Sequence, residues 1–121
     1  MMHKHRISVQ NAWNGLVWAL KTQPNYRIHL FLAFCAVIGG IIFRITYEEF
    51  LVIAVLITIG LSVETINTAL EAATDAIDTS WREDIKIAKD VSAGAMLIFA
   101  LGAFFISCII FLPKIVAVFG L

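Results

Sequence analysis

Charged residues are scarce in this sequence of 121 residues. They make up 15% of the chain, whereas an ordinary soluble domain has about 25%. Hydrophobic residues account for 60%, and the mean hydropathy is +0.89. This balance is typical of a membrane protein, and the length leaves room for one domain over residues 1–121. Because the formal net charge is +0, no nucleic-acid partner is expected.

Sequence signals of several familiar sites are also missing. Cys35 and Cys108 lie in apolar segments without a His/Cys cluster, so we expect buried small side chains and not metal ligands. Neither a Walker A loop nor a kinase-type glycine-rich loop is present, so any phosphate site must be built from helix faces. The N-terminal segment lacks the apolar core and the cleavage site of a secretory signal peptide, so we do not expect it to be removed.

Three uncharged apolar runs cover residues 28–43, 50–63 and 91–113. A membrane-spanning helix needs about 20 residues, so the third run suffices alone, whereas the second must continue into the polar residues after it. Before the first run, apolar and polar side chains segregate at helical spacing, as in a helix that lies in the membrane interface. We therefore predict an all-α membrane protein with a surface helix over about residues 6–22 and transmembrane helices over about residues 27–46, 49–78 and 85–118.

Four polar side chains follow the second apolar run on one face of its helix. At about 100° per residue, Glu64, Asn67, Glu71 and Asp75 fall within an arc of roughly 80°. An ionisable group at membrane depth costs about 2.5 kcal/mol or more, so it needs a partner or a function. This polar stripe must therefore face a cavity or another helix near one membrane surface. Three spans alone can hardly enclose it, so we expect an oligomer.

The third predicted span begins with Lys89 and Asp90, which complement the stripe. A lysine ammonium is a mobile point charge suited to phosphate oxygens. Magnesium takes oxygen ligands and usually keeps waters, so one or two carboxylates suffice, and Glu71 is placed for that role. Glu64 is the deepest acid and is our candidate general base. Together these residues indicate chemistry on a phosphate.

Lysine and arginine are unevenly distributed over the connecting segments. Four lie in residues 1–27, which contain no acidic residue, and three lie in residues 79–90, whereas the opposite side has only Arg44 and Lys114. The positive-inside rule therefore places the N-terminus, the polar stripe and the 79–90 segment in the cytoplasm, where ATP is available.

Two segments carry a resemblance to a known family. Glu64-x-x-Asn67-Thr-Ala-Leu-Glu71-Ala-x-x-Asp75 and Ala88-Lys89-Asp90-x-x-Ala-Gly94-Ala resemble the signature of the prokaryotic diacylglycerol kinase / undecaprenol kinase family. The likeness covers essentially the whole chain. It implies a homotrimer in the bacterial plasma membrane that transfers the γ-phosphate of ATP to a lipid hydroxyl at the cytoplasmic interface, with magnesium as cofactor.

The resemblance also implies roles for individual residues. It makes Glu64 the catalytic base and Glu71 a metal ligand. Further residues would contact or organise ATP and its surroundings: Asn67, Lys89 and Asp90 near the phosphates, Ser80, Trp81 and Arg82 beside the nucleotide, and Asn11 with Lys4 or Arg6 from the surface helix.

The sequence departs from the family pattern in two places. Gln23 stands where the family often has a second metal-binding glutamate, and its neutral amide oxygen would bind magnesium more weakly. The segment around Trp81 lacks the usual tyrosine-histidine pair, so Trp81 either stacks on adenine or is an aromatic at headgroup depth. The Asn25-Tyr-Arg-Ile-His29 segment resembles the undecaprenol kinase branch more than the diacylglycerol kinase branch, which implies undecaprenol slightly ahead of diacylglycerol as acceptor. We expect an interfacial hydrogen bond from His29.

Two other functions are compatible with parts of the pattern. Acids within a membrane span also occur in small oligomeric proton-coupled transporters and channels. That alternative does not explain why Lys89 and Asp90 lie on the same side as the acids. A catalytically weak relative that only binds lipid is the other alternative, and it is favoured by Gln23.

Overall fold

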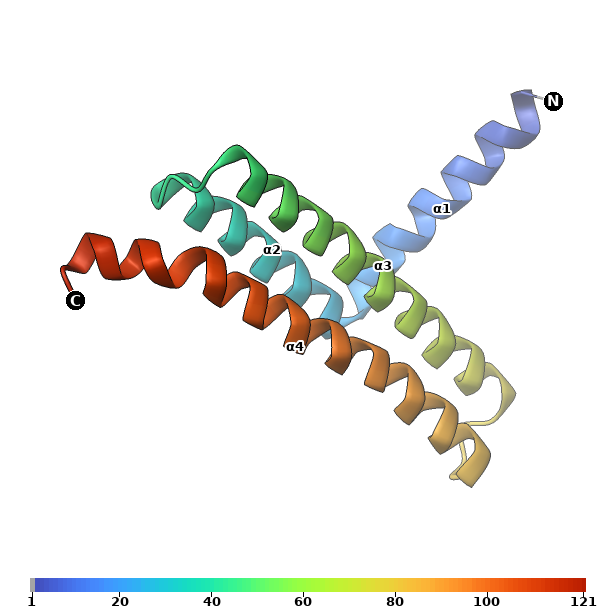
Figure 1. Ribbon diagram of the computed structural model, residues 1–121. Coiled ribbons are helices and arrows are strands. Elements are labelled where there is room, and N and C mark those ends of the chain that lie inside the picture. The colour runs from blue at the N-terminus through green and yellow to red at the C-terminus, as the bar shows by residue number, and fades with distance from the viewer. Residues whose placement is uncertain (1) are drawn as a thin grey trace.

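The computed structural model describes the backbone of residues 2–121 and the side chains of residues 6–121, so the Lys4 side chain lies outside the described part. It contains four helices, α1 (Met2–Thr22), α2 (Pro24–Ile42), α3 (Tyr47–Ile77) and α4 (Glu83–Phe119), and residues 2–121 contain no strand. Helices α2, α3 and α4 run side by side, whereas α1 projects away from them (Figure 1). The prediction of an all-α chain with three helices able to span a membrane is confirmed.

Local sequence signals set the helix boundaries. Gln23 is extended between α1 and α2, and Pro24, which fits the first position of a helix, begins α2. At the start of α3, the Thr46 hydroxyl accepts from the Glu49 backbone N–H at 3.2 Å, and the Glu49 carboxylate accepts from the Thr46 N–H at 2.7 Å. This capping box satisfies two backbone donors that a helix start otherwise leaves without partners.

Helix α3 is the centre of the bundle, because both α2 and α4 pack against it. At one end, a small apolar core forms around Ile45, Ile53 and Ile110. Further along α3, the Phe99 ring of α4 lies directly against Gly60, where a Cβ atom would overlap it. Helices α3 and α4 therefore approach closely at Gly60, and α3 holds the polar stripe between its neighbours.

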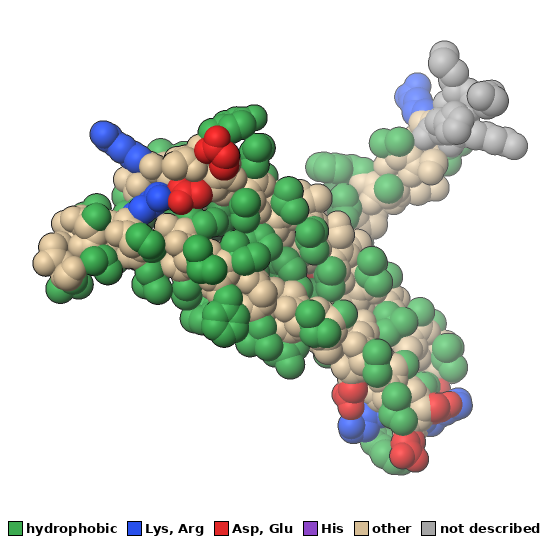
Figure 2. All heavy atoms as spheres, viewed as in Figure 1, with side chains coloured by type: hydrophobic (Ala, Val, Ile, Leu, Met, Phe, Trp, Pro, Cys, Tyr) green, Lys and Arg blue, Asp and Glu red, His purple; other side chains and the backbone are tan. Residues whose placement is uncertain are grey.

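The outer surface of the bundle is strongly apolar. All three long helices are apolar enough to cross a membrane, and little of each is buried within the chain. Figure 2 shows the Lys, Arg, Asp and Glu side chains of the bundle gathered at its two ends, with hydrophobic side chains over the surface between them. A surface of this kind is covered by lipid or by other subunits.

Candidate active site

The polar stripe of α3 changes from buried to exposed along the helix. Only 3% of the surface of Glu64 and 6% of that of Asn67 are accessible. Glu71 is half-buried and Asp75 is exposed. Because the helix rises about 1.5 Å per residue, the stripe covers roughly 16 Å from an enclosed carboxylate to one in contact with solvent.

The imidazole of His29 on α2 lies beside the Glu64 carboxylate. Its Nε2 lies 3.7 Å from Glu64 Oε2, and among the described side chains Glu64 accepts no hydrogen bond. Tyr26, on the same face of α2, accepts a 3.4 Å hydrogen bond from the Thr65 hydroxyl of α3. Residues three apart share a helix face, so the start of α2 fixes both side chains against the middle of α3.

The Asn67 amide is engaged at both of its ends. Its oxygen accepts a 2.7 Å hydrogen bond from the Ser92 hydroxyl of α4, and its nitrogen donates to Glu71 Oε1 at 3.4 Å. Asn67 therefore orients Glu71 in this structure. Ser92 was not among the residues that the sequence indicated, although it lies one turn after Lys89 on the same face of α4.

Lys89 connects α4 to the exposed end of the stripe. Its Nζ lies 2.5 Å from Asp75 Oδ1. Asp90, by contrast, pairs with Lys86 one turn earlier in α4, at 2.6 Å. Both pairs are well exposed, so each contributes little to the free energy of folding. Lys89 can therefore leave Asp75 for another anion with little loss of free energy.

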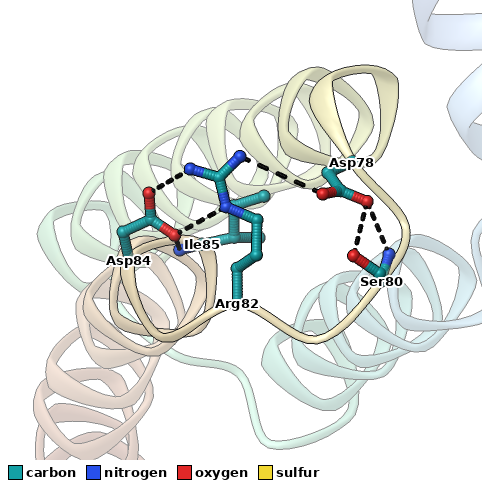
Figure 3. Close-up of polar contacts among 5 residues, drawn as sticks. All are labelled: Asp78, Ser80, Arg82, Asp84 and Ile85. Atoms are coloured by element: carbon teal, nitrogen blue, oxygen red, sulfur yellow. Dashed lines mark hydrogen bonds and ion pairs between the residues drawn. The ribbon is translucent and has the colours of Figure 1, made fainter.

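The connection between α3 and α4 is organised around Arg82 (Figure 3). Its guanidinium lies between Asp84, at 2.6 Å, and Asp78, at 4.0 Å. The backbone N–H and the hydroxyl of Ser80 donate to Asp78 and hold the pKa of that carboxyl below its usual value. Asp78 is therefore charged at neutral pH. Trp81 is 78% exposed and borders a shallow depression with Arg82.

The structure separates the predicted site residues into groups. Glu64, Asn67 and Glu71 lie together, with Lys89 at the end of their stripe. From Glu64 to the 78–82 connection, α3 rises roughly 20 Å. Asn11 is exposed on the projecting helix α1, and the described side-chain hydrogen bond of Gln23 goes to Thr22 at 3.2 Å. In the described part of the chain, no group of three or more His, Cys, Asp or Glu could hold a metal ion.

Comparison with known proteins gives the family. The model of the family described as prokaryotic diacylglycerol kinase matches residues 10–111. The chain belongs to this family. The predicted family assignment is confirmed, and the three long apolar helices and the family together identify a membrane protein.

Two relatives are similar to this chain over most of its length. A diacylglycerol kinase of Synechocystis sp. is 32% identical over 112 residues, which cover 92% of this chain and 64% of the relative. An undecaprenol kinase of Bacillus subtilis is 33% identical over 108 residues, which cover 89% of this chain and 88% of the relative. The matched region thus spans less than two thirds of the first relative and most of the second.

Proposed function

We propose that this protein is an ATP-dependent lipid kinase, which transfers the γ-phosphate of ATP to the hydroxyl group of a membrane lipid alcohol. The observation that carries the proposal is the buried Glu64 carboxylate at the enclosed end of the stripe, with Glu71 and Lys89 between it and solvent. Family membership supports the same reaction class. A transporter would not need the lysine of α4 at the solvent end of an acidic stripe.

Glu64 acts as general base in this proposal. Its carboxylate accepts the proton of the lipid hydroxyl, whose oxygen forms the new bond to the γ-phosphorus of ATP. The bond from that phosphorus to the oxygen bridging the β- and γ-phosphates breaks, and ADP leaves. The described side chains donate no hydrogen bond to the Glu64 oxygens, so these atoms remain available to accept a substrate proton.

Magnesium fits the oxygen ligands of the stripe. Asn67 orients the half-buried Glu71 carboxylate, and a magnesium site in a kinase needs only one or two carboxylates besides phosphate and water. Glu71 would hold the ion, and Gln23 is the second proposed ligand. When bound, magnesium neutralises charge on the phosphates. Lys89 would bind phosphate oxygens, and the neighbouring Asp90 would contact or organise the phosphates and their surroundings.

Replacing Gln23 by glutamate tests that metal assignment. Gln23→Glu should lower the magnesium concentration for half-maximal activity by about three- to tenfold, the size of one modest polar interaction, because a charged oxygen replaces a neutral one. Titrating magnesium at saturating ATP measures the effect. Gln10→Glu, which adds the same charge at an exposed position of α1, is the matched control. An unchanged magnesium requirement in Gln23→Glu would remove Gln23 from the metal site.

We also propose that the working enzyme is a homotrimer with its N-terminus in the cytoplasm of a bacterial cell. The N-terminal part of α1 points away from the bundle and from the connection between α3 and α4 (Figure 1). Asn11 would therefore meet a nucleotide at the loop of a neighbouring subunit more readily than at its own. Ser80, Trp81 and Arg82 would border that nucleotide. The excess of lysine and arginine at this end of the bundle favours the cytoplasmic side.

Undecaprenol is the acceptor that we place first, slightly ahead of diacylglycerol. The segment that ends in His29 supports this order, and the two relatives are named for one acceptor each. Purified protein assayed side by side with the two lipids, ATP and magnesium should phosphorylate undecaprenol at the higher kcat/KM. A higher kcat/KM for diacylglycerol would reverse the order without changing the reaction class.

A further inference from the structure

His29 lies beside the proposed base but takes no part in the proposed proton and phosphoryl transfer. Its Nε2 is 3.7 Å from Glu64 Oε2, too far for a direct hydrogen bond. In the described part of the chain, no side chain accepts a hydrogen bond from His29. A third atom can lie about 2.8 Å from both groups at once, since the three distances form a triangle. The pair is thus spaced to hold one small polar group between its members.

An apolar cavity between the long helices, partly open at the surface of the bundle, extends to His29. It has a volume of about 390 Å³ and is lined by side chains of α2, α3 and α4. Its lining includes Leu61 and Phe99 near one end and Ile53 near the other. His29 and Ser107 are the polar residues of this lining, and His29 is the one that lies beside Glu64. The cavity is therefore suited to a hydrocarbon chain that carries a polar group at the His29 end.

We infer that His29 is an acceptor-binding residue, which orients the hydroxyl group of the lipid alcohol toward Glu64. With the hydrocarbon chain in the cavity, the hydroxyl lies between the two side chains. It donates its hydrogen to Glu64 Oε2 and accepts a hydrogen bond from His29 Nε2–H. The proton goes to Glu64 during transfer, and His29 keeps its own proton throughout. This inference rests on the proposed lipid kinase function and adds to it the residue that positions the acceptor.

Three substitutions at position 29 test the inference. His29→Leu has a side chain of similar size but no hydrogen-bond donor, so kcat/KM for the lipid alcohol should fall about tenfold, the effect of one hydrogen bond. The KM for ATP should not change. His29→Gln places an amide N–H near the position of Nε2 and should restore most of the activity. His29→Asn places its amide nearer the position of Nδ1 and should not.

Initial rates with undecaprenol and with diacylglycerol, at saturating ATP and then at saturating lipid, give these parameters. Wild-type acceptor kinetics in His29→Leu would overturn the inference. Equal losses in His29→Leu and His29→Gln would also overturn it, because a donor at this position would then not matter. A raised KM for ATP would assign His29 to the nucleotide instead. If the wild-type protein phosphorylates neither lipid, the proposed function itself fails, and the inference about His29 fails with it.

Discussion

Glu64→Gln is expected to reduce lipid phosphorylation by about 10²- to 10⁴-fold, the usual contribution of a general base. The amide has nearly the shape of the carboxylate, so it fits the enclosed site, where only 3% of the residue surface is accessible. It cannot accept the hydroxyl proton. ATP binding should persist, because Glu64 lies at the opposite end of the stripe from Lys89. Initial rates with the lipid acceptor, together with equilibrium ATP binding, measure both effects.

Glu48→Gln provides the matched control for this prediction. Glu48 is exposed in the first turn of the same helix, at the opposite end from the stripe. The same loss of one negative charge there should leave the rate unchanged. Near wild-type turnover in Glu64→Gln would show that Glu64 is not the base. A loss of folding in that variant would assign Glu64 a structural role, and a loss of ATP binding alone would assign Glu64 to the nucleotide site.

Lys89→Met is expected to lower kcat by about 10²- to 10³-fold, the usual cost of removing one group that stabilises transition-state charge. The methionine retains much of the aliphatic length but has no charge to place on the phosphates. Folding should be little affected, because the exposed ion pair with Asp75 contributes little to stability. Kinetics at varied ATP and a thermal unfolding curve separate the catalytic loss from any loss of structure.

Lys86→Met is the control for Lys89. Lys86 lies one turn earlier on α4 and also forms an exposed ion pair, with Asp90 at 2.6 Å. Its substitution removes the same charge from the same helix, and we expect it to retain most of the wild-type rate. An equal fall in kcat in the two variants would mean that the total positive charge at this end of α4 supports the reaction. Lys89 would then have no specific contact with the phosphates.

The fold class followed from the sequence because hydropathy and length strongly constrain a membrane chain. Uncharged runs too long for loops must become helices, and the short second run required α3 to continue through Glu64 to Asp75. The helical period then placed the acids of the stripe on one face. The helix boundaries were harder to predict from the sequence, because capping contacts determine where each helix begins. The structure begins α3 at Tyr47 and α4 at Glu83, whereas the sequence suggested about residues 49 and 85.

Contacts between helices could not be read from periodicity in the same way. A helical period gives the face on which a side chain lies, but not the rotation and shift of a neighbouring helix. Ser92 therefore emerged as the partner of Asn67 only in the structure. Asp90 pairs within its own helix with Lys86, and Asp75 is the carboxylate that contacts Lys89. His29 gave only the general expectation of an interfacial hydrogen bond, and the structure places it beside Glu64.

Transfer of label from ATP to lipid tests the central claim most directly. Purified protein in lipid vesicles that contain undecaprenol or diacylglycerol is incubated with magnesium and ATP labelled at the γ-phosphate, and the lipid is then extracted. We expect label in a phosphorylated lipid with the wild-type protein and almost none with Glu64→Gln. Label that stays in ATP, or that appears only as inorganic phosphate, with both lipids would contradict it.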